Sequence, residues 1–298
     1  MQTLWGYPAS LELARWAEDE GLAAFAVADH YLLGDTDEPA YDQLTLLGGI
    51  ARETERIRLV TLVSPVTFRH PAVMLKVAVT LDEMSGGRFA LGVGTGWMES
   101  EHRRFGLDLP GWDERFDRLE DALGYLRAAL VPEPTAYEGR YYRLEAFGPR
   151  PLPTGLELVV GGSGARRTPE LAGHFADEYN VFPSEHGSVS EKVEAARRAA
   201  ETAGRDPDGL RISVAFPALA GRTDSEFRSN LAEVAARRNA GPDDLVSRFE
   251  KLGIPLGPPS RLAEGVDRLQ GQGVERVYLQ VGALSVETAK TAVEAFRG

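Results

Sequence analysis

The stretch from Ile57 to Gly94, IRLVTLVSPVTFRHPAVMLKVAVTLDEMSGGRFALGVG, holds the pattern that decides the fold. It begins with one short apolar run, IRLVTLV, and ends with another, RFALGVG. Between these runs, apolar residues recur every three or four positions, which is the spacing of one buried helix face. These positions are Met74, Val77, Leu81 and Met84. The order strand, helix, strand predicts a βαβ unit whose two parallel strands are covered on both faces.

The same alternation continues along the whole chain. Further apolar runs rich in Val, Leu, Ile and Phe span residues 23–29, 156–162, 178–182, 211–217 and 276–282, and a poorer candidate, QTLW, occupies residues 2–5. Strand and helix alternating throughout a chain of 298 residues predict an α/β protein, a closed (β/α)8 TIM barrel rather than an open doubly wound sheet. Two additional helical patterns predict an insertion after strand seven, at about 218–259, within one domain covering residues 1–298.

Composition excludes several classes of partner. The net charge is −12 at pH 7, whereas binding to nucleic acid or to an anionic membrane needs clustered Lys and Arg. No apolar run approaches the roughly 18 to 20 residues of a membrane span, and the start MQTLWGYPAS lacks the features of a signal peptide. We therefore expect a cytoplasmic protein that binds neither nucleic acid nor membrane.

The absence of cysteine removes further chemistry. It excludes disulfides, thiolate catalysis and Cys-ligated metal centres. The motif ESEH brings Glu99, Glu101 and His102 together, but it lacks the histidine pair of a zinc-binding helix, and no second histidine cluster exists. We predict no metal site.

In a TIM barrel, the loops that follow the carboxyl ends of the strands carry the chemistry. One such loop begins with Asp29 and His30, where a neutral imidazole can exchange a proton with a bound ligand. Another, GTGWMESEH, begins at Gly94. Its G-x-G-x-G pattern does not open into a helix, which argues against a dinucleotide fingerprint. Trp97 beside these glycines predicts an aromatic wall for a flat ligand, the alternative being a ring packed against its own loop.

The segment LELVVGGSGARRTPELAGHFA, residues 156–176, is the sharpest local signal. A strand ends in four residues, GGSG, whose backbone N–H groups can approach an anion closely, and a helix with Pro169 in its first turn follows. This arrangement predicts a phosphate site at residues 161–164, with Arg166 and Arg167 beside it. The alternative is that the glycines only form a tight turn and that the arginines are solvated.

These motifs together carry a resemblance to a family. The runs from Leu62 to Leu123, YEGRYYRL, VVGGSGARRTPELAGHFADEYNVF and GRDP resemble the bacterial luciferase-like superfamily, most closely its coenzyme F420-dependent oxidoreductases, over about residues 8–297. The resemblance implies a dimeric barrel that binds F420, or alternatively FMN, with the ring in the barrel mouth. Only MQTLW precedes the first helical pattern, so we expect either a minimal first strand or a start that lies upstream.

The resemblance also implies roles for individual residues. It places His30 near the hydride-carrying carbon as the catalytic residue, and it places a non-prolyl cis peptide near the end of strand three. The implied cofactor-binding residues are Asp29, His30, Leu62, Val63, Ser64, Gly94, Thr95, Trp97, Gly161, Gly162, Ser163, Gly164 and Arg166. As substrate-contacting residues we predict Trp5, Phe182 and Phe216. Trp97 occupies the position of a glutamate in the sugar-phosphate dehydrogenases of the family, which argues against a sugar substrate.

Three functions follow from these observations. The first is an F420-dependent oxidoreductase that transfers a hydride between the deazaflavin and a small organic molecule. The second is an FMN-dependent monooxygenase that uses O2 and receives reduced flavin from a separate reductase. The third is a non-catalytic flavin-binding protein, against which the joint presence of DH, GTGW and GGSG argues.

Overall fold

A computed structural model of the protein describes residues 1–3, 5–32, 40–133, 135–147 and 151–297. Eight parallel strands close into a barrel, because β1 lies between β11 and β2 while β3 pairs with β5. In barrel order the strands are β1 (Gln2–Thr3), β2 (Ala24–Val27), β3 (Arg58–Thr61), β5 (Phe89–Gly94), β8 (Glu157–Gly162), β9 (Glu178–Val181), β10 (Arg211–Pro217) and β11 (Arg276–Gln280). The predicted (β/α)8 barrel is therefore confirmed, and each of its strands lies in one of the apolar runs.

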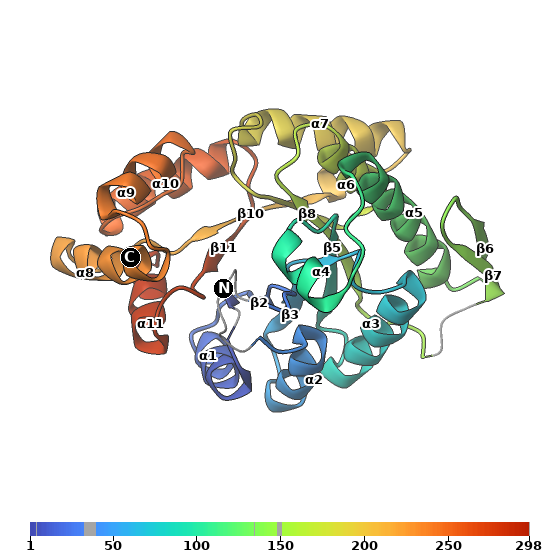
Figure 1. Ribbon diagram of the computed structural model, residues 1–298, viewed down its shortest axis with the longest axis horizontal. Coiled ribbons are helices and arrows are strands. Elements are labelled where there is room, and N and C mark those ends of the chain that lie inside the picture. Colours follow the sequence, from blue (N-terminus) through green and yellow to red (C-terminus); the bar gives the residue numbers. More distant parts are fainter. Residues whose placement is uncertain (4, 33–39, 134, 148–150, 298) are drawn as a thin grey trace.

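Three short strands lie outside this set. The third strand continues beyond a break as β4 (Ser64–Pro65), which also pairs with β5. The strands β6 (Thr135–Glu138) and β7 (Arg143–Phe147) form an antiparallel hairpin at the edge of the molecule, beside α5 (Figure 1).

Helices form an outer ring around the strands (Figure 1). The ring contains α1 (Tyr7–Asp19), α2 (Gln43–Glu53), α3 (Pro71–Ser85), α5 (Trp112–Leu130), α6 (Arg167–Phe175), α7 (Val189–Thr202), α8 (Asp224–Arg237), α9 (Pro242–Lys251), α10 (Pro259–Gly271) and α11 (Val286–Ala295), with a 3₁₀ turn at Pro207–Gly209. The short helix α4 (Glu99–Phe105) lies inside the ring, over the strands (Figure 1). The helical insertion after strand seven is confirmed, since α8 and α9 lie between β10 and α10. Among the described residues, no helix combines the length and apolar character needed to cross a membrane.

Alternating side chains of the strands build two separate cores. Outward-facing residues such as Leu59, Leu91 and Val160 pack against the helices. Inward-facing residues form a smaller cluster inside the barrel, namely Ala24, Ala26, Val60, Leu62, Ala90, Val159, Ala215 and Tyr278. Small side chains suit this position, because an eight-stranded barrel is only wide enough for its own side chains.

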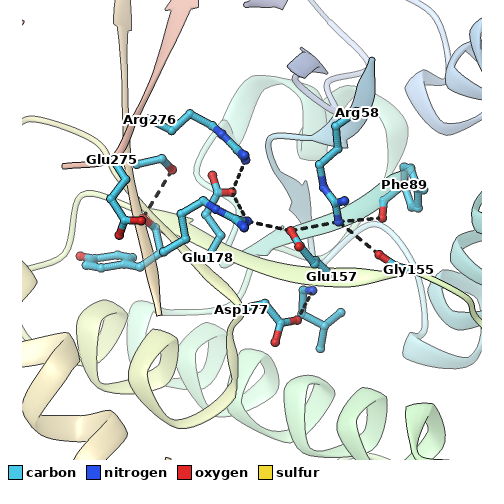
Figure 2. Close-up of polar contacts among 12 residues, drawn as sticks. Arg58, Phe89, Gly155, Glu157, Asp177, Glu178, Glu275 and Arg276 are labelled. Atoms are coloured by element: carbon cyan, nitrogen blue, oxygen red, sulfur yellow. Dashed lines mark hydrogen bonds and ion pairs between the residues drawn. The ribbon is translucent and has the colours of Figure 1, made fainter. Parts of the chain in front are cut away.

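Charged side chains occupy the amino-terminal end of the barrel. Five strands begin with them, namely Arg58, Glu157, Glu178, Arg211 and Arg276. Figure 2 shows Arg276 reaching the buried Glu178, at 2.6 Å, and Arg58 reaching Glu157, at 2.9 Å. Arg211 bridges the two glutamates, at 2.9 and 3.5 Å. This network fills one end of the barrel, so that a ligand has to enter at the carboxyl end.

Candidate functional site at the carboxyl end of the barrel

The best-defined polar contact at the barrel mouth joins His30 to Glu101. His30 follows β2, and its Nδ1 lies 3.0 Å from Glu101 Oε1 on α4. The other carboxylate oxygen of Glu101 accepts the backbone N–H of Tyr31 at 3.0 Å, and the Glu101 side chain is only 1% exposed. Because an ionised carboxylate only accepts hydrogen bonds, this geometry assigns the proton of the neutral imidazole to Nδ1. Nε2 then keeps a lone pair, and it has no partner within the described part of the chain.

Trp97 stands beside His30. The residue is 62% exposed, and its ring meets the imidazole edge-on, with the ring centroids 5.9 Å apart. The indole is thus largely open to solvent, as an aromatic wall would be, rather than packed against its own loop. The loop that carries it is held by Arg115 on α5, whose Nη1 donates to the carbonyl of Gly96 at 2.7 Å.

Val63 lies among glycines at the centre of the mouth. The peptide bond between Leu62 and Val63 is cis, at the place where the resemblance implies such a bond. A Cβ added to Gly94 or to Gly161 would lie 2.8 Å from a methyl carbon of Val63, and one added to Gly92 would lie 2.0 Å from the carbonyl oxygen of Thr61. The strands therefore need glycine here, because the side chain of Val63 and the carbonyl of Thr61 fill the space that a side chain would take.

Asp29 and Ser64 do not face the mouth with their side chains. Both are fully buried, and the Ser64 hydroxyl donates to Asp29 at 2.6 Å. Asp29 also forms an ion pair with Arg69, which in turn binds Asp42 at the start of α2. Burial of Arg69 opposes its charge, but attraction by Asp29 and the hydrogen bond between them raise the pKa of Arg69. The predicted contact of Asp29 and Ser64 with the cofactor stays a prediction, whereas their side chains brace the loops that carry His30 and Val63.

His102 is a second structural group. Its Nδ1 lies 2.7 Å from the carbonyl of Met98, and its Nε2 lies 2.7 Å from the hydroxyl of Thr67. It is buried and anchors α4 to the loop after β4. In the sequence, Glu101 and His102 were examined only as possible metal ligands. Their roles as partners of His30 and Thr67 were not predicted.

The glycine loop after β8 has unpaired donors. Within the described residues, the backbone N–H groups of Ser163, Gly164 and Ala165 donate no hydrogen bond. A Cβ at Gly164 would lie 2.6 Å from the hydroxyl oxygen of Thr168, so glycine is required where the loop meets the first turn of α6. Consecutive unpaired N–H groups before a helix N-terminus suit an anion.

The two arginines after this loop differ in their partners. Arg166 is 83% exposed, and its nearest acidic group is Glu170, one turn further along α6, at 3.7 Å. Arg167 binds Asp117 of α5 at 2.7 Å. The predicted contact between Arg166 and the cofactor stays a prediction, because its guanidinium is largely exposed, whereas Arg167 holds α5 to α6.

The three residues predicted to contact the substrate lie in different surroundings. Phe182 follows β9 and is partly exposed, as a residue at the mouth would be. Phe216 is fully buried and packs outward against Phe296, so its prediction was wrong because it occupies an outward-facing position of β10. Trp5 packs against the outer core and donates from Nε1 to the carbonyl of Gly282 at 3.3 Å, which ties the loop after β1 to the loop after β11.

Comparison with known proteins identifies the family. The model of the family described as luciferase-like monooxygenase matches residues 6–276. The chain belongs to the luciferase-like monooxygenase family. The resemblance inferred from the sequence is thereby confirmed, and the protein is an enzyme of this oxidoreductase family.

Relatives in this family use two kinds of cofactor. An F420-dependent glucose-6-phosphate dehydrogenase of Nakamurella multipartita is 32% identical over 262 residues, which cover 80% of this chain and 76% of the relative. An FMNH2-dependent dimethylsulfone monooxygenase of Pseudomonas putida is 24% identical over 306 residues, which cover 93% and 83%. Membership of the luciferase-like family thus indicates a flavin or deazaflavin enzyme.

Solved structures share the fold. A monooxygenase from Streptomyces bottropensis superimposes with a TM-score of 0.81 at 23% identity, covering 97% of this chain and 91% of the other. An F420-dependent secondary alcohol dehydrogenase, solved with an F420–acetone adduct, superimposes with a TM-score of 0.79 at 18% identity, covering 98% and 94%.

Proposed function

We propose that the protein is an F420-dependent oxidoreductase acting on a small organic substrate. The observation that carries the proposal is the His30–Glu101 pair, which leaves Nε2 of His30 unpaired beside the exposed ring of Trp97. Hydride transfer to or from a carbon that bears oxygen requires a proton to move at that oxygen, and an imidazole of fixed tautomer can accept or return it. The relative that is 32% identical is named as F420-dependent, whereas the FMNH2-dependent relative is 24% identical.

The residues at the mouth fit such a cofactor. Gly94 and Gly161 let the backbone pass close to Val63 at the mouth, and the unpaired N–H groups of residues 163–165 fit a phosphate. When bound, F420 supplies a hydride carried on its deazaflavin ring. The chain itself orients that ring and holds a proton acceptor at His30, beside Trp97.

The substrate class is narrowed by Trp97. A carboxylate at this position would be needed for proton transfer with a sugar hydroxyl, as in the sugar-phosphate dehydrogenases, whereas the indole is apolar and exposed. Phe182 adds a second partly exposed aromatic ring. We infer a small substrate with an apolar portion and one reducible or oxidisable carbon. We also propose that the enzyme is a cytoplasmic homodimer.

FMN is the second candidate cofactor. The relative from Pseudomonas putida, which matches 93% of this chain, is FMNH2-dependent. In addition, Arg167 pairs with Asp117 at 2.7 Å, so it offers no free charge to the acidic tail of F420. An FMN enzyme would use O2 as co-substrate and would receive reduced flavin from a separate reductase.

The deciding experiment measures equilibrium binding of F420 and of FMN by fluorescence. We expect F420 to bind at micromolar concentration or tighter and FMN to bind more weakly. Gly162→Asp places a negative charge in the phosphate loop and should abolish binding of both. Gly271→Asp is the matched control, because a Cβ at Gly271 meets nothing within 4 Å and the residue lies at the end of α10. Preference for FMN would reassign the protein as a monooxygenase, and binding of neither would refute both candidates.

A further inference from the structure

Lys192 is a buried cation without an acidic partner. It lies near the start of α7, its side chain is 1% exposed, and its Nζ donates to the Ser184 hydroxyl at 3.0 Å. Within the described residues, no carboxylate forms an ion pair with it. The adjacent Glu191 is engaged elsewhere, since its carboxylate accepts the backbone N–H of Ser188 at 2.8 Å and caps the helix.

This position is unfavourable for a positive charge. Removing an ammonium group from water without a paired anion destabilises the folded state, and the N-terminal end of a helix is already positive. Burial lowers the pKa of Lys192, and the nearby negative charge of Glu191 opposes this only in part. A lysine kept here at such a cost indicates that an anion completes its surroundings when a ligand is bound.

The contacts of Ser184 connect Lys192 to the glycine loop. Its hydroxyl donates to the carbonyl of Ser163 at 3.1 Å, and it accepts from Lys192 Nζ and from the backbone N–H of His186 at 3.3 Å. The C=O and N–H of a trans peptide point in opposite directions. The contact that turns the Ser163 carbonyl toward Ser184 therefore turns the Gly164 N–H away from it, and that N–H is one of the three unpaired donors.

We propose that Lys192, acting with Ser184, supplies the positive charge of the phosphate site and sets the orientation of its glycine loop. This inference rests on the proposed function, because it assumes that a phosphate-bearing flavin or deazaflavin occupies the mouth. Lys192 is a positioning and specificity residue here, which distinguishes cofactors that carry a phosphate from those that lack one.

The test compares ligands that differ in the phosphate. Dissociation constants are measured for FMN and riboflavin, which differ by the phosphate alone, and for F420 and its phosphate-free chromophore, with wild type and Lys192→Met. We expect the preference for the phosphate-bearing ligand to fall about tenfold in the variant, because the positive charge behind the glycine loop is lost and Ser184 no longer has its Lys192 partner, while binding of the phosphate-free ligand is unchanged. Ser184→Ala should lower the same preference by a smaller factor.

A second readout separates binding from folding. Without ligand, Lys192→Met should raise the unfolding temperature, since it removes a buried charge. Lys290→Met is the control, because Lys290 pairs with Glu12 at 2.7 Å on the outer surface, and it should alter neither the preference nor the sign of this shift.

Each remaining outcome is decisive. An unchanged phosphate preference in Lys192→Met, or an equal loss for both ligands of a pair, would overturn the inference, as would a wild type without any preference for phosphate. If FMN binds and F420 does not, the proposed function fails while the FMN and riboflavin pair still tests Lys192.

Discussion

Glu101→Gln tests the proposed role of His30 with the smallest change in shape. In the wild type, two donors meet one carboxylate, namely Nδ1–H of His30 and the backbone N–H of Tyr31, each at 3.0 Å. A glutamine side chain has a single acceptor oxygen and an NH2 group that can only donate. If its oxygen keeps the Tyr31 contact, its NH2 faces Nδ1, so the imidazole has to move its proton to Nε2.

The expected losses of stability and of rate follow from the hydrogen bonds that change. Two charge-assisted hydrogen bonds become neutral ones, which should destabilise the protein by about 1–3 kcal/mol. For a chain of this size, that corresponds to a fall in unfolding temperature of about 2–6 °C. With Nε2 protonated, His30 can no longer accept a proton there, and loss of a general base typically lowers the rate about 10²- to 10⁴-fold.

The assay combines nitrogen NMR of the His30 imidazole with turnover under saturating F420. We expect the NMR signals to show the Nε2–H tautomer, turnover to fall at least about a hundredfold, and the dissociation constant of F420 to stay unchanged. Glu99→Gln is the control, because Glu99 is exposed on the same helix two residues away. Wild-type turnover in Glu101→Gln with the proton still on Nδ1 would refute the reasoning.

Three further predictions concern stability. Burial opposes the charge of Glu18, but hydrogen bonds from the backbone N–H groups of residues 55–57 lower its pKa below the ordinary 4.5. The stability that ionised Glu18 contributes is present above that value and is lost as pH falls through the folded-state pKa. Glu18→Gln should therefore be less stable than the wild type at pH 7 by about 1–2 kcal/mol. Denaturant titrations should show this difference in the free energy of unfolding shrinking toward pH 3. Gly161→Ala places a Cβ 2.8 Å from a methyl carbon of Val63, so the variant should lose about 1–3 kcal/mol of stability and should bind the cofactor more weakly. Unchanged cofactor binding would argue against the requirement for glycine beside Val63. Glu178→Gln leaves two arginines without their buried partner and should cost about 2–3 kcal/mol, less than for a fully buried pair because both arginines are partly exposed; an unchanged denaturation midpoint would contradict this.

Local pattern was sufficient for the elements of the fold. Runs such as IRLVTLV and RFALGVG became β3 and β5 because strands covered on both faces need apolar residues at nearly every position. The local sequence pattern could not predict whether a given side chain of a strand faces the inside or the outside of the barrel. Phe216 belongs to an apolar run in which both faces look alike, so only the register of β10 between β9 and β11 shows that it points toward α11 and not into the mouth.

The candidate site also contains residues that the sequence could predict and residues that it could not. Histidine after β2, tryptophan after β5 and glycines after β8 were predictable from sequence, because the barrel places every such loop at one end. Glu101 was not predictable as the partner of His30, since 71 residues separate them and the contact depends on how α4 packs across the mouth. Lys192 was likewise not predictable, because in the sequence it resembles an ordinary surface residue of an amphipathic helix.

The sequence by itself determined a (β/α)8 barrel of the luciferase-like family with its chemistry at the carboxyl ends of the strands, because periodicity and loop position are local properties. Only the tertiary structure decided which side chains are held, buried or left unpaired there. It turned Asp29 away from the mouth, bound His30 to Glu101 and enclosed Lys192 behind the glycine loop. The physical reason is that burial and hydrogen-bond partners arise between segments that are distant in sequence, and no local pattern records them.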